Sequence, residues 1–226
     1  MTGIFITPMA RIRRRFANNP LRNANQGTVL MEFAAGLPFF MLIGFGGAEY
    51  MNYITTHTAI SQLALTVADN ASRSQNNTNL ASPQMRELDV NDIFKGADIQ
   101  ANKLDFANRG RIVLSSLEQN ATNQQYIHWQ RCFGKGPYPS SYGTEGQIVS
   151  GGMGPTGNKV LAPKDSAIMF VQVTYRYKPV MYAEWLSAAS RKITYTAAFQ
   201  IRDSRDLAAG VTNPSPTATK SACSAT

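Results

Sequence analysis

The sequence predicts an α+β protein in which one long N-terminal helix precedes an antiparallel β-sheet. An apolar run extends from Thr28 to Tyr50, and an amphipathic helical pattern follows it directly. Four later segments have the composition of strands, and two of them alternate apolar and polar residues. Such alternation is typical of antiparallel strands that bury one face of their sheet.

The apolar run is long enough to cross a membrane. A helix from Thr28 to Tyr50 would be about 34 Å long, slightly more than the hydrocarbon core of a bilayer. Membrane helices tolerate glycine and proline, and small residues let such helices approach closely. Core helices of soluble proteins, the alternative, are rarely this long and this apolar. The glycines and the proline of the run are Gly36, Pro38, Gly44, Gly46 and Gly47.

The residues before the apolar run are basic, which predicts its orientation. Positive flanks stay in the cytoplasm, so residues 1–27 are expected inside and the chain after Tyr50 in the periplasm. Without residues 1–27, the formal net charge falls from +8 to +3. No Lys/Arg stripe remains, so we expect no nucleic-acid partner. Five arginines and no acidic residue precede Glu32: Arg11, Arg13, Arg14, Arg15 and Arg22.

The order of the segments differs from that of a secretory signal peptide, in which the apolar stretch precedes the cleavage site. Here a polar leader ends at Gly27 and the apolar run begins after it. Glu32 is the one early charge of the run, and Phe33 follows it. A carboxylate at the centre of a bilayer costs roughly 2.5–3.5 kcal/mol, so its presence requires an explanation.

The string GTVLMEFAAGLPFF, which contains Gly27, Glu32, Phe33 and Pro38, resembles TadE-like minor pilins and pseudopilins of tight-adherence (type IVb) pilus systems. The segment 89–116 also resembles the start of a TadE-type periplasmic domain. The resemblance implies a pilin-like fold, with a long N-terminal transmembrane and stalk helix packed on an antiparallel β-sheet. It also implies that a prepilin peptidase cuts between Gly27 and Thr28, although Thr28 is more polar than the usual first mature residue.

The same resemblance implies that Glu32 and Phe33 act in assembly. Cleavage would create an α-amino group at Thr28, one turn from Glu32, near a helix N-terminus that favours a carboxylate. In the family this glutamate is thought to meet the N-terminal amine of a neighbouring subunit. The alternative is a carboxylate that snorkels to the headgroups. The implied partners are the inner membrane, the prepilin peptidase, other pilin or pseudopilin subunits and the assembly platform.

The chain is expected to contain a leader (1–27), a transmembrane helix (28–50), a stalk helix (51–75), a periplasmic α+β domain (76–202) and a Ser/Thr/Pro-rich tail (203–226). Apolar stalk residues recur at helical steps and, in a pilin-like protein, would pack against the sheet. These residues are Tyr53, His57, Ile60, Ala64, Val67 and Ala71.

Strands are predicted over 111–117, 125–132, 167–177 and 191–201. Ser82 and Pro83 fit an N-cap and a first helical position, and Asp89 fits the cap of a second short helix. A further short helix is predicted over 179–189. Two sets of alternating residues each share one face: Met169, Val171, Val173 and Tyr175, and then Ile193, Tyr195, Ala197 and Phe199.

Cys132 and Cys223 are the two cysteines of the chain. Outside the cytoplasm such a pair usually forms a disulfide, and two unpaired thiols are the alternative. A disulfide would close a loop of about 90 residues, contribute roughly 4 kcal/mol in the chain-entropy model, and fix a tail that its composition would otherwise leave disordered.

The sequence contains no pattern that we assign to catalysis, a cofactor or a metal. His57 and His128 have no accompanying ligand motif, so we expect structural roles for both. The stretch SGGMGPTGNK lacks the ending of a phosphate loop and is expected to form a glycine-rich turn. The function predicted is a pilus assembly subunit. The alternatives are an uncleaved membrane anchor that presents a periplasmic binding module, a DNA-capture pilin and an envelope enzyme.

Overall fold

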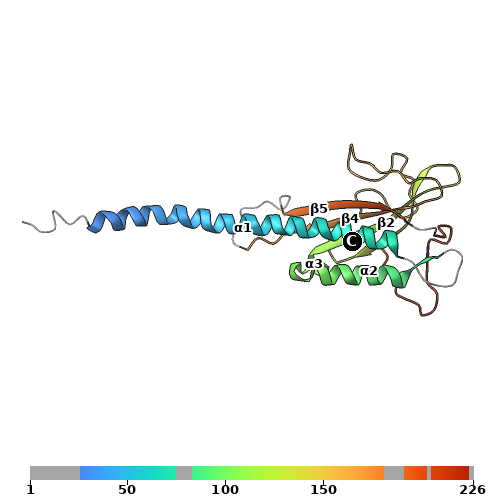
Figure 1. Ribbon diagram of the computed structural model, residues 1–226, viewed down its shortest axis with the longest axis horizontal. Helices are drawn as coiled ribbons and strands as arrows, with labels where there is room; N and C mark the ends of the chain where they lie inside the picture. Colours follow the sequence, from blue (N-terminus) through green and yellow to red (C-terminus); the bar gives the residue numbers. More distant parts are fainter. Residues whose placement is uncertain (1–25, 75–82, 181–190, 203–204, 224–226) are drawn as a thin grey trace, which may run out of the picture. The chain divides into compact units, whose positions relative to one another are not determined.

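The computed structural model describes residues 26–74, 83–180, 191–202 and 205–223. The chain divides into two compact units, Met1–Ala48 and Glu49–Thr226. Helix α1 (Gln26–Arg73) contributes its first part to the first unit and its second part to the second (Figure 1). The predicted transmembrane and stalk segments therefore belong to one helix as far as Arg73.

A four-stranded antiparallel sheet lies at the centre of the second unit. Its strands are β2 (Gly110–Gln119), β3 (Gln125–Phe133), β4 (Ile168–Arg176) and β5 (Lys192–Gln200), in the spatial order β3-β2-β4-β5. All four predicted strands are confirmed, with ends that differ by no more than two residues from the prediction. The α+β class, with a long apolar N-terminal helix and an antiparallel sheet, is confirmed with them.

One face of this sheet is covered by α1 and by α2 (Glu87–Gln100), which lie side by side on it (Figure 1). The predicted stripe of α1 is buried there, since Ile60 and Ala71 are both 0% exposed. The predicted alternation of β4 and β5 is also confirmed, because Val171 and Ile193 lie in one buried apolar cluster with Ile60 and Ala71. This cluster is the main hydrophobic core of the domain.

The other face of the sheet is also covered, contrary to the half-buried sheet that the alternation predicted. Leu117 and Phe170 point into a second apolar cluster together with Met153 from the long β3–β4 connection. That connection, residues 134–167, follows β3 and folds back over the sheet. The central strands β2 and β4 are therefore buried on both faces.

The predicted glycine-rich turn forms part of this cover and is confirmed as a turn. Met153 and Val160 exchange backbone hydrogen bonds of 3.1 and 2.8 Å, which closes the turn. Gly154 has a φ of +131°, and a Cβ at this position would lie 2.5 Å from the carbonyl oxygen of Asn158. A residue with a side chain would therefore open the turn.

The start of α2 differs from the prediction. The helix begins at Glu87 and its N-cap is Arg86, so Pro83 is not a first helical position and Asp89 is not an N-cap. Asp89 instead occupies the third helical position, where Oδ2 accepts a hydrogen bond of 3.0 Å from the backbone N–H of Arg86. The guanidinium of Arg86 pairs with the same carboxylate at 2.8 Å. Asp89 thus caps the helix from inside its first turn.

Shorter elements complete the second unit, namely β1 (Met85–Arg86), η2 (Asn102–Leu104), α3 (Phe106–Arg109) and β6 (Val211–Thr212). Strand β6 pairs in parallel with β1, which attaches part of the predicted tail to the start of α2. The predicted N-cap Ser82 and residues 181–189 of the predicted short helix lie outside the described residues.

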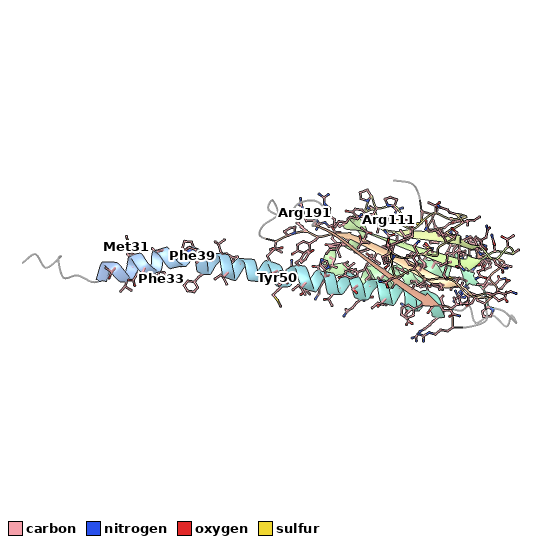
Figure 2. All side chains as sticks on the ribbon, turned by 90° about the horizontal axis from the view of Figure 1, so that it is seen from above. Met31, Phe33, Phe39, Tyr50, Arg111 and Arg191 are labelled. Atoms are coloured by element: carbon pink, nitrogen blue, oxygen red, sulfur yellow. A yellow bond between two sulfur atoms is a disulfide. The ribbon has the colours of Figure 1, made fainter. Side chains whose placement is uncertain are left out.

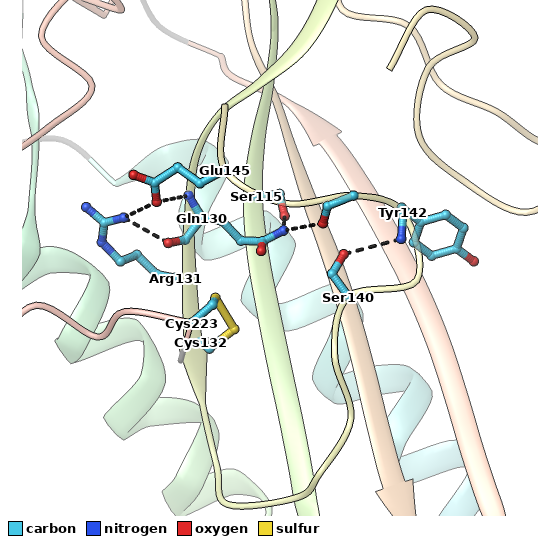
Figure 3. Close-up of a disulfide and its surroundings, with 9 residues drawn as sticks. Ser115, Gln130, Arg131, Cys132, Ser140, Tyr142, Glu145 and Cys223 are labelled. Atoms are coloured by element: carbon cyan, nitrogen blue, oxygen red, sulfur yellow. Dashed lines mark hydrogen bonds and ion pairs between the residues drawn. A yellow bond between two sulfur atoms is a disulfide. The ribbon is translucent and has the colours of Figure 1, made fainter. Parts of the chain in front are cut away.

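A disulfide joins Cys132 and Cys223, so the expected pairing is confirmed (Figure 3). Beside it, the backbone N–H of Cys132 donates a hydrogen bond of 2.8 Å to the carbonyl of Ser221. An isolated antiparallel bridge pairs Arg131 with Ala222. The tail therefore runs along the outer edge of β3, an edge that would otherwise present unpaired backbone groups.

Arg131, the neighbour of Cys132, connects β3 to two other parts of the domain. Its side chain is 4% exposed and forms two hydrogen bonds through Nε, of 2.9 and 3.0 Å, to the carboxylate of Glu87 at the start of α2. Its Nη1 donates at 3.0 Å to Glu145 of the β3–β4 connection (Figure 3). Buried ion pairs of this kind hold elements in register, and removing one partner leaves an uncompensated charge.

We expect the double substitution Cys132→Ser and Cys223→Ser to lower the free energy of unfolding of the domain by about 2–5 kcal/mol. The bridge spans 91 residues of sequence, so its loss frees a large loop in the unfolded chain. Denaturant unfolding of the full-length protein in detergent, followed by tryptophan fluorescence, measures the change. Reductant should destabilise the wild-type protein equally and leave the variant unaffected. Equal stability of the two oxidised proteins would contradict the prediction.

Candidate functional site

The first part of α1 exposes a continuous apolar surface. Phe33, Phe39 and Phe40 are 65–73% exposed, and Figure 2 shows Met31, Phe33 and Phe39 projecting from the helix. Among the described residues, α1 is the one helix long and apolar enough to cross a membrane, although a signal sequence would also meet this criterion. Apolar surface of this extent is typical of a segment that lies in lipid or against other apolar helices.

The residues predicted for processing and assembly lie at the start of this helix. Gly27 and Thr28 fall in its first turn, and Glu32 and Phe33 follow in the second. All four are exposed. Glu32 forms no ion pair with another described residue, as the salt bridges of the described chain all lie beyond Ala48. The helix therefore presents one carboxylate within an otherwise apolar surface.

Four glycines of this segment are not explained by contacts with other described residues. A Cβ added to Gly27, Gly44, Gly46 or Gly47 would meet no heavy atom within 4 Å. None of these glycines has a positive φ, so alanine would fit each position and would favour the helix. They leave bare backbone on the surface of α1, where another apolar helix can approach closely.

Glu49, which the sequence analysis did not single out, is the first residue of α1 in the second unit and is 8% exposed. Its Oε1 accepts a hydrogen bond of 2.5 Å from the hydroxyl of Tyr177, and its Oε2 accepts one of 2.9 Å from the backbone N–H of Val180. Asn52 donates to the same tyrosine hydroxyl at 2.8 Å. This Glu49–Tyr177 contact fixes the start of the domain part of α1 to the segment after β4.

His57 continues this contact two turns further along α1. Its Nδ1 lies 3.1 Å from the hydroxyl of Tyr195 in β5, and its ring packs edge-on against Tyr53 at 4.4 Å between centroids. Burial lowers the pKa of His57, so the neutral ring is the form that the fold favours. The histidine acts as a packing residue between α1 and the sheet.

The second histidine, His128, belongs to a buried polar group that is not suited to catalysis. Its Nδ1 lies 2.9 Å from Glu118, and the hydroxyl of Ser116 donates to the same carboxylate at 2.6 Å. Burial raises the pKa of Glu118, an effect that the bonds from Ser116 and His128 oppose. Ser116 is 0% exposed and bonded to the carboxylate rather than to the imidazole. The adjoining cavity, about 10 Å³, is too small for a substrate.

Within the described part of the chain, no group of three or more His, Cys, Asp or Glu side chains could hold a metal ion. Comparison of the chain with protein-family models, with curated proteins and with solved structures finds no match in any of the three. A functional proposal therefore rests on the sequence and on the geometry of α1 and the domain.

Tyr177 provides a pH test of the Glu49–Tyr177 contact. Burial raises the pKa of Tyr177, and the hydrogen bond to Glu49 raises it further. The folded protein therefore keeps a proton that an unfolded tyrosine loses near pH 10, so this stabilisation is present below about pH 10 and is lost as the pH rises beyond it. Tyr177→Phe should reduce the slope of unfolding free energy against pH by up to about 1.4 kcal/mol per pH unit.

Denaturant unfolding of the full-length protein in detergent, at a series of alkaline pH values, measures this slope. Tyr138→Phe is the matched control, because it removes the same hydroxyl from a tyrosine outside the Glu49–Tyr177 contact, with Lys192 over its ring. An unchanged slope in Tyr177→Phe would show that the hydroxyl ionises equally in both states.

Proposed function

We propose that this protein is a minor pilin or pseudopilin of a tight-adherence (type IVb) pilus system, which a prepilin peptidase cuts after Gly27. The observation that carries the proposal is the position of Glu32, five residues beyond Gly27 on an apolar helix whose side chains no described residue of its own unit covers. The processed subunit would wait in the inner membrane through the first part of α1. It would then act in pilus assembly or surface adhesion.

A neighbouring subunit offers the cationic partner that Glu32 does not have among the described residues of its own chain. After cleavage, the α-amino group of Thr28 is a cation at the start of an apolar helix. Pairing it with the Glu32 carboxylate of another subunit would neutralise both charges within the apolar environment. Burial of the large apolar side chains of α1 against neighbouring helices would drive association, and the charge pair would set the register.

Two features support a periplasmic location for the domain. Disulfides persist in oxidising compartments such as the bacterial periplasm, and Cys132 is bonded to Cys223. The five leader arginines indicate that the N-terminus stays in the cytoplasm. A single membrane span that connects a cytoplasmic leader to a periplasmic domain is consistent with both features.

An uncleaved membrane anchor that presents a binding module is the second candidate. The observation in its favour is that Gly27 and Thr28 already lie within the first turn of α1. A peptidase would have to open this turn before it could reach the peptide bond. Terminal turns fray readily, so this step is compatible with cleavage as well.

The first test is processing. We expect Gly27→Ala to abolish peptidase-dependent cleavage, while wild-type protein co-expressed with a prepilin peptidase starts at Thr28. N-terminal sequencing and the intact mass of the membrane-bound protein measure this. Gly47→Ala is the matched control, since it makes the same change in the same helix and its Cβ also meets no atom within 4 Å. A wild-type chain that keeps its leader arginines with and without the peptidase would favour the uncleaved anchor.

The second test separates assembly from processing. We expect Glu32→Gln to be cut normally but to lose most of its incorporation into pili, because its uncharged amide cannot neutralise the amine of a neighbour. Glu32→Asp keeps the charge and should retain part of the incorporation. Immunodetection of the subunit in sheared pilus fractions measures the difference. Normal incorporation of Glu32→Gln would refute the assembly role of this carboxylate.

A further inference from the structure

A basic pocket lies in the second unit beside the first two turns of α1 that follow Tyr50. Its volume is about 470 Å³. Asn52 and Thr56 of α1 form one wall, and the segment that contains η2 and α3 forms another. Its cationic residues are Lys103, Arg109 and Lys178.

The charges of this pocket are not balanced within the described chain. Lys103 and Lys178 are exposed, and no described acidic residue forms an ion pair with Lys103, Arg109 or Lys178. The one carboxylate of the lining is Asp105, whose Oδ1 accepts a hydrogen bond of 2.7 Å from Asn108. A second carboxylate, that of Glu49, is bonded to Tyr177 and Val180 of the lining. Three cations therefore face two carboxylates, and the described residues around the pocket carry a net positive charge that favours anions.

Contacts with the sheet hold the cationic segment in place. The hydroxyl of Tyr175 in β4 donates a hydrogen bond of 2.9 Å to the carbonyl of Leu104, and its ring stacks on Phe106. Arg109 interacts with the same hydroxyl, which opposes the rise that burial causes in the pKa of Tyr175. The segment that carries Lys103 and Arg109 is thus anchored to Tyr175 of β4 through Leu104, Phe106 and Arg109.

The depth of the pocket follows from its position along α1. Asn52 and Thr56 lie about 3 and 9 Å beyond Tyr50 along the helix axis, at 1.5 Å per residue. A headgroup layer is about 5–8 Å thick, judging from the difference between the hydrocarbon core and the whole bilayer. If the apolar run ends at the edge of the hydrocarbon core near Tyr50, as the proposed function requires, Asn52 lies within the headgroup layer and Thr56 just beyond it. The pocket then opens at headgroup level.

We propose that the basic pocket binds a phosphate group, supplied by the headgroup of an anionic phospholipid beside α1. Two amines, a guanidinium and the polar wall formed by Asn52 and Thr56 surround a concave space that suits a compact anion rather than an extended polymer. The inference rests on the proposed membrane placement of α1. Occupation by a lipid would hold this part of the domain at the membrane surface.

The experiment uses full-length protein in nanodiscs of phosphatidylcholine alone or of phosphatidylcholine mixed with phosphatidylglycerol. Amide hydrogen exchange of residues 102–110, followed by mass spectrometry, reports on the pocket. We expect exchange to slow by roughly threefold or more in the anionic discs, because the cations sit at the charged surface. The triple variant Lys103→Gln/Arg109→Gln/Lys178→Gln should show no slowing, and Lys103→Gln/Lys178→Gln, which keeps the contact between Arg109 and Tyr175, should lose most of it.

The matched control is Lys95→Gln/Lys159→Gln/Lys164→Gln, which removes the same charge from exposed positions outside the pocket. It should keep the full response to anionic lipid, and an equal loss in this control would overturn the proposal in favour of general charge attraction.

Three other outcomes would also contradict the proposal. Equal slowing by inorganic phosphate in phosphatidylcholine discs would show that the lipid is not the source of the anion. If wild-type protein enters the discs but its amide exchange does not depend on the lipid, lipid binding by the pocket is refuted and the proposed function is unaffected. Failure to enter either disc would overturn the membrane placement, and the proposed function with it.

Discussion

Helix α1 carries two kinds of apolar surface, and the rest of the structure depends on how each is covered. Between Ile60 and Ala71, the side chains that face the sheet are 0–1% exposed. Burial of such surface contributes about 25 cal/mol per Å², so this stretch organises the core of the domain. The large side chains between Val29 and Phe45 are 39–74% exposed. They contribute nothing to the folding of the domain and stabilise the protein only where lipid or other helices surround them.

The domain is consequently built to be stable without help from the first part of α1. Its sheet is covered on both faces, by α1 and α2 on one and by the β3–β4 connection on the other. The disulfide and the buried Arg131–Glu87 pair join the tail, β3 and α2. This closure is compatible with a domain that folds outside the membrane, as the proposed anchoring through α1 requires. Such independence suits both a pilin-like subunit and an anchored binding module.

Long periodic features were predictable from the sequence, whereas contacts between distant short segments were not. The stripe of α1 and the strands β4 and β5 repeat a pattern over nine or more residues, so burial could be assigned to one face. Strands β1 and β6 have two residues each, too few for any period. Met153 stands isolated in a glycine-rich stretch, and only the fold shows that it covers the second face of the sheet. The disulfide between Cys132 and Cys223 was predictable because two cysteines in one chain either pair with each other or remain as free thiols.

Glu49 shows a further limit, since its hydrogen-bond partner Tyr177 lies 128 residues away in sequence. In the sequence, Glu32 and Glu49 are equivalent, as the two carboxylates of one apolar run. In the structure they differ, because Glu49 is buried and accepts bonds from Tyr177 and Val180, whereas Glu32 is exposed and pairs with no described residue.

This difference bears on the choice between the two functional candidates. The free-energy cost of burying Glu49 is offset inside its own domain, so that carboxylate needs no partner molecule. The cost of placing Glu32 in a bilayer has to be offset from outside the described chain, by headgroups or by another subunit. A simple anchor would be more stable with an apolar residue at this position, because it gains nothing from the charge. In the proposed assembly subunit the charge would recognise the amine of a neighbour, so the pilin-like proposal rests on Glu32 rather than on the length or apolarity of α1.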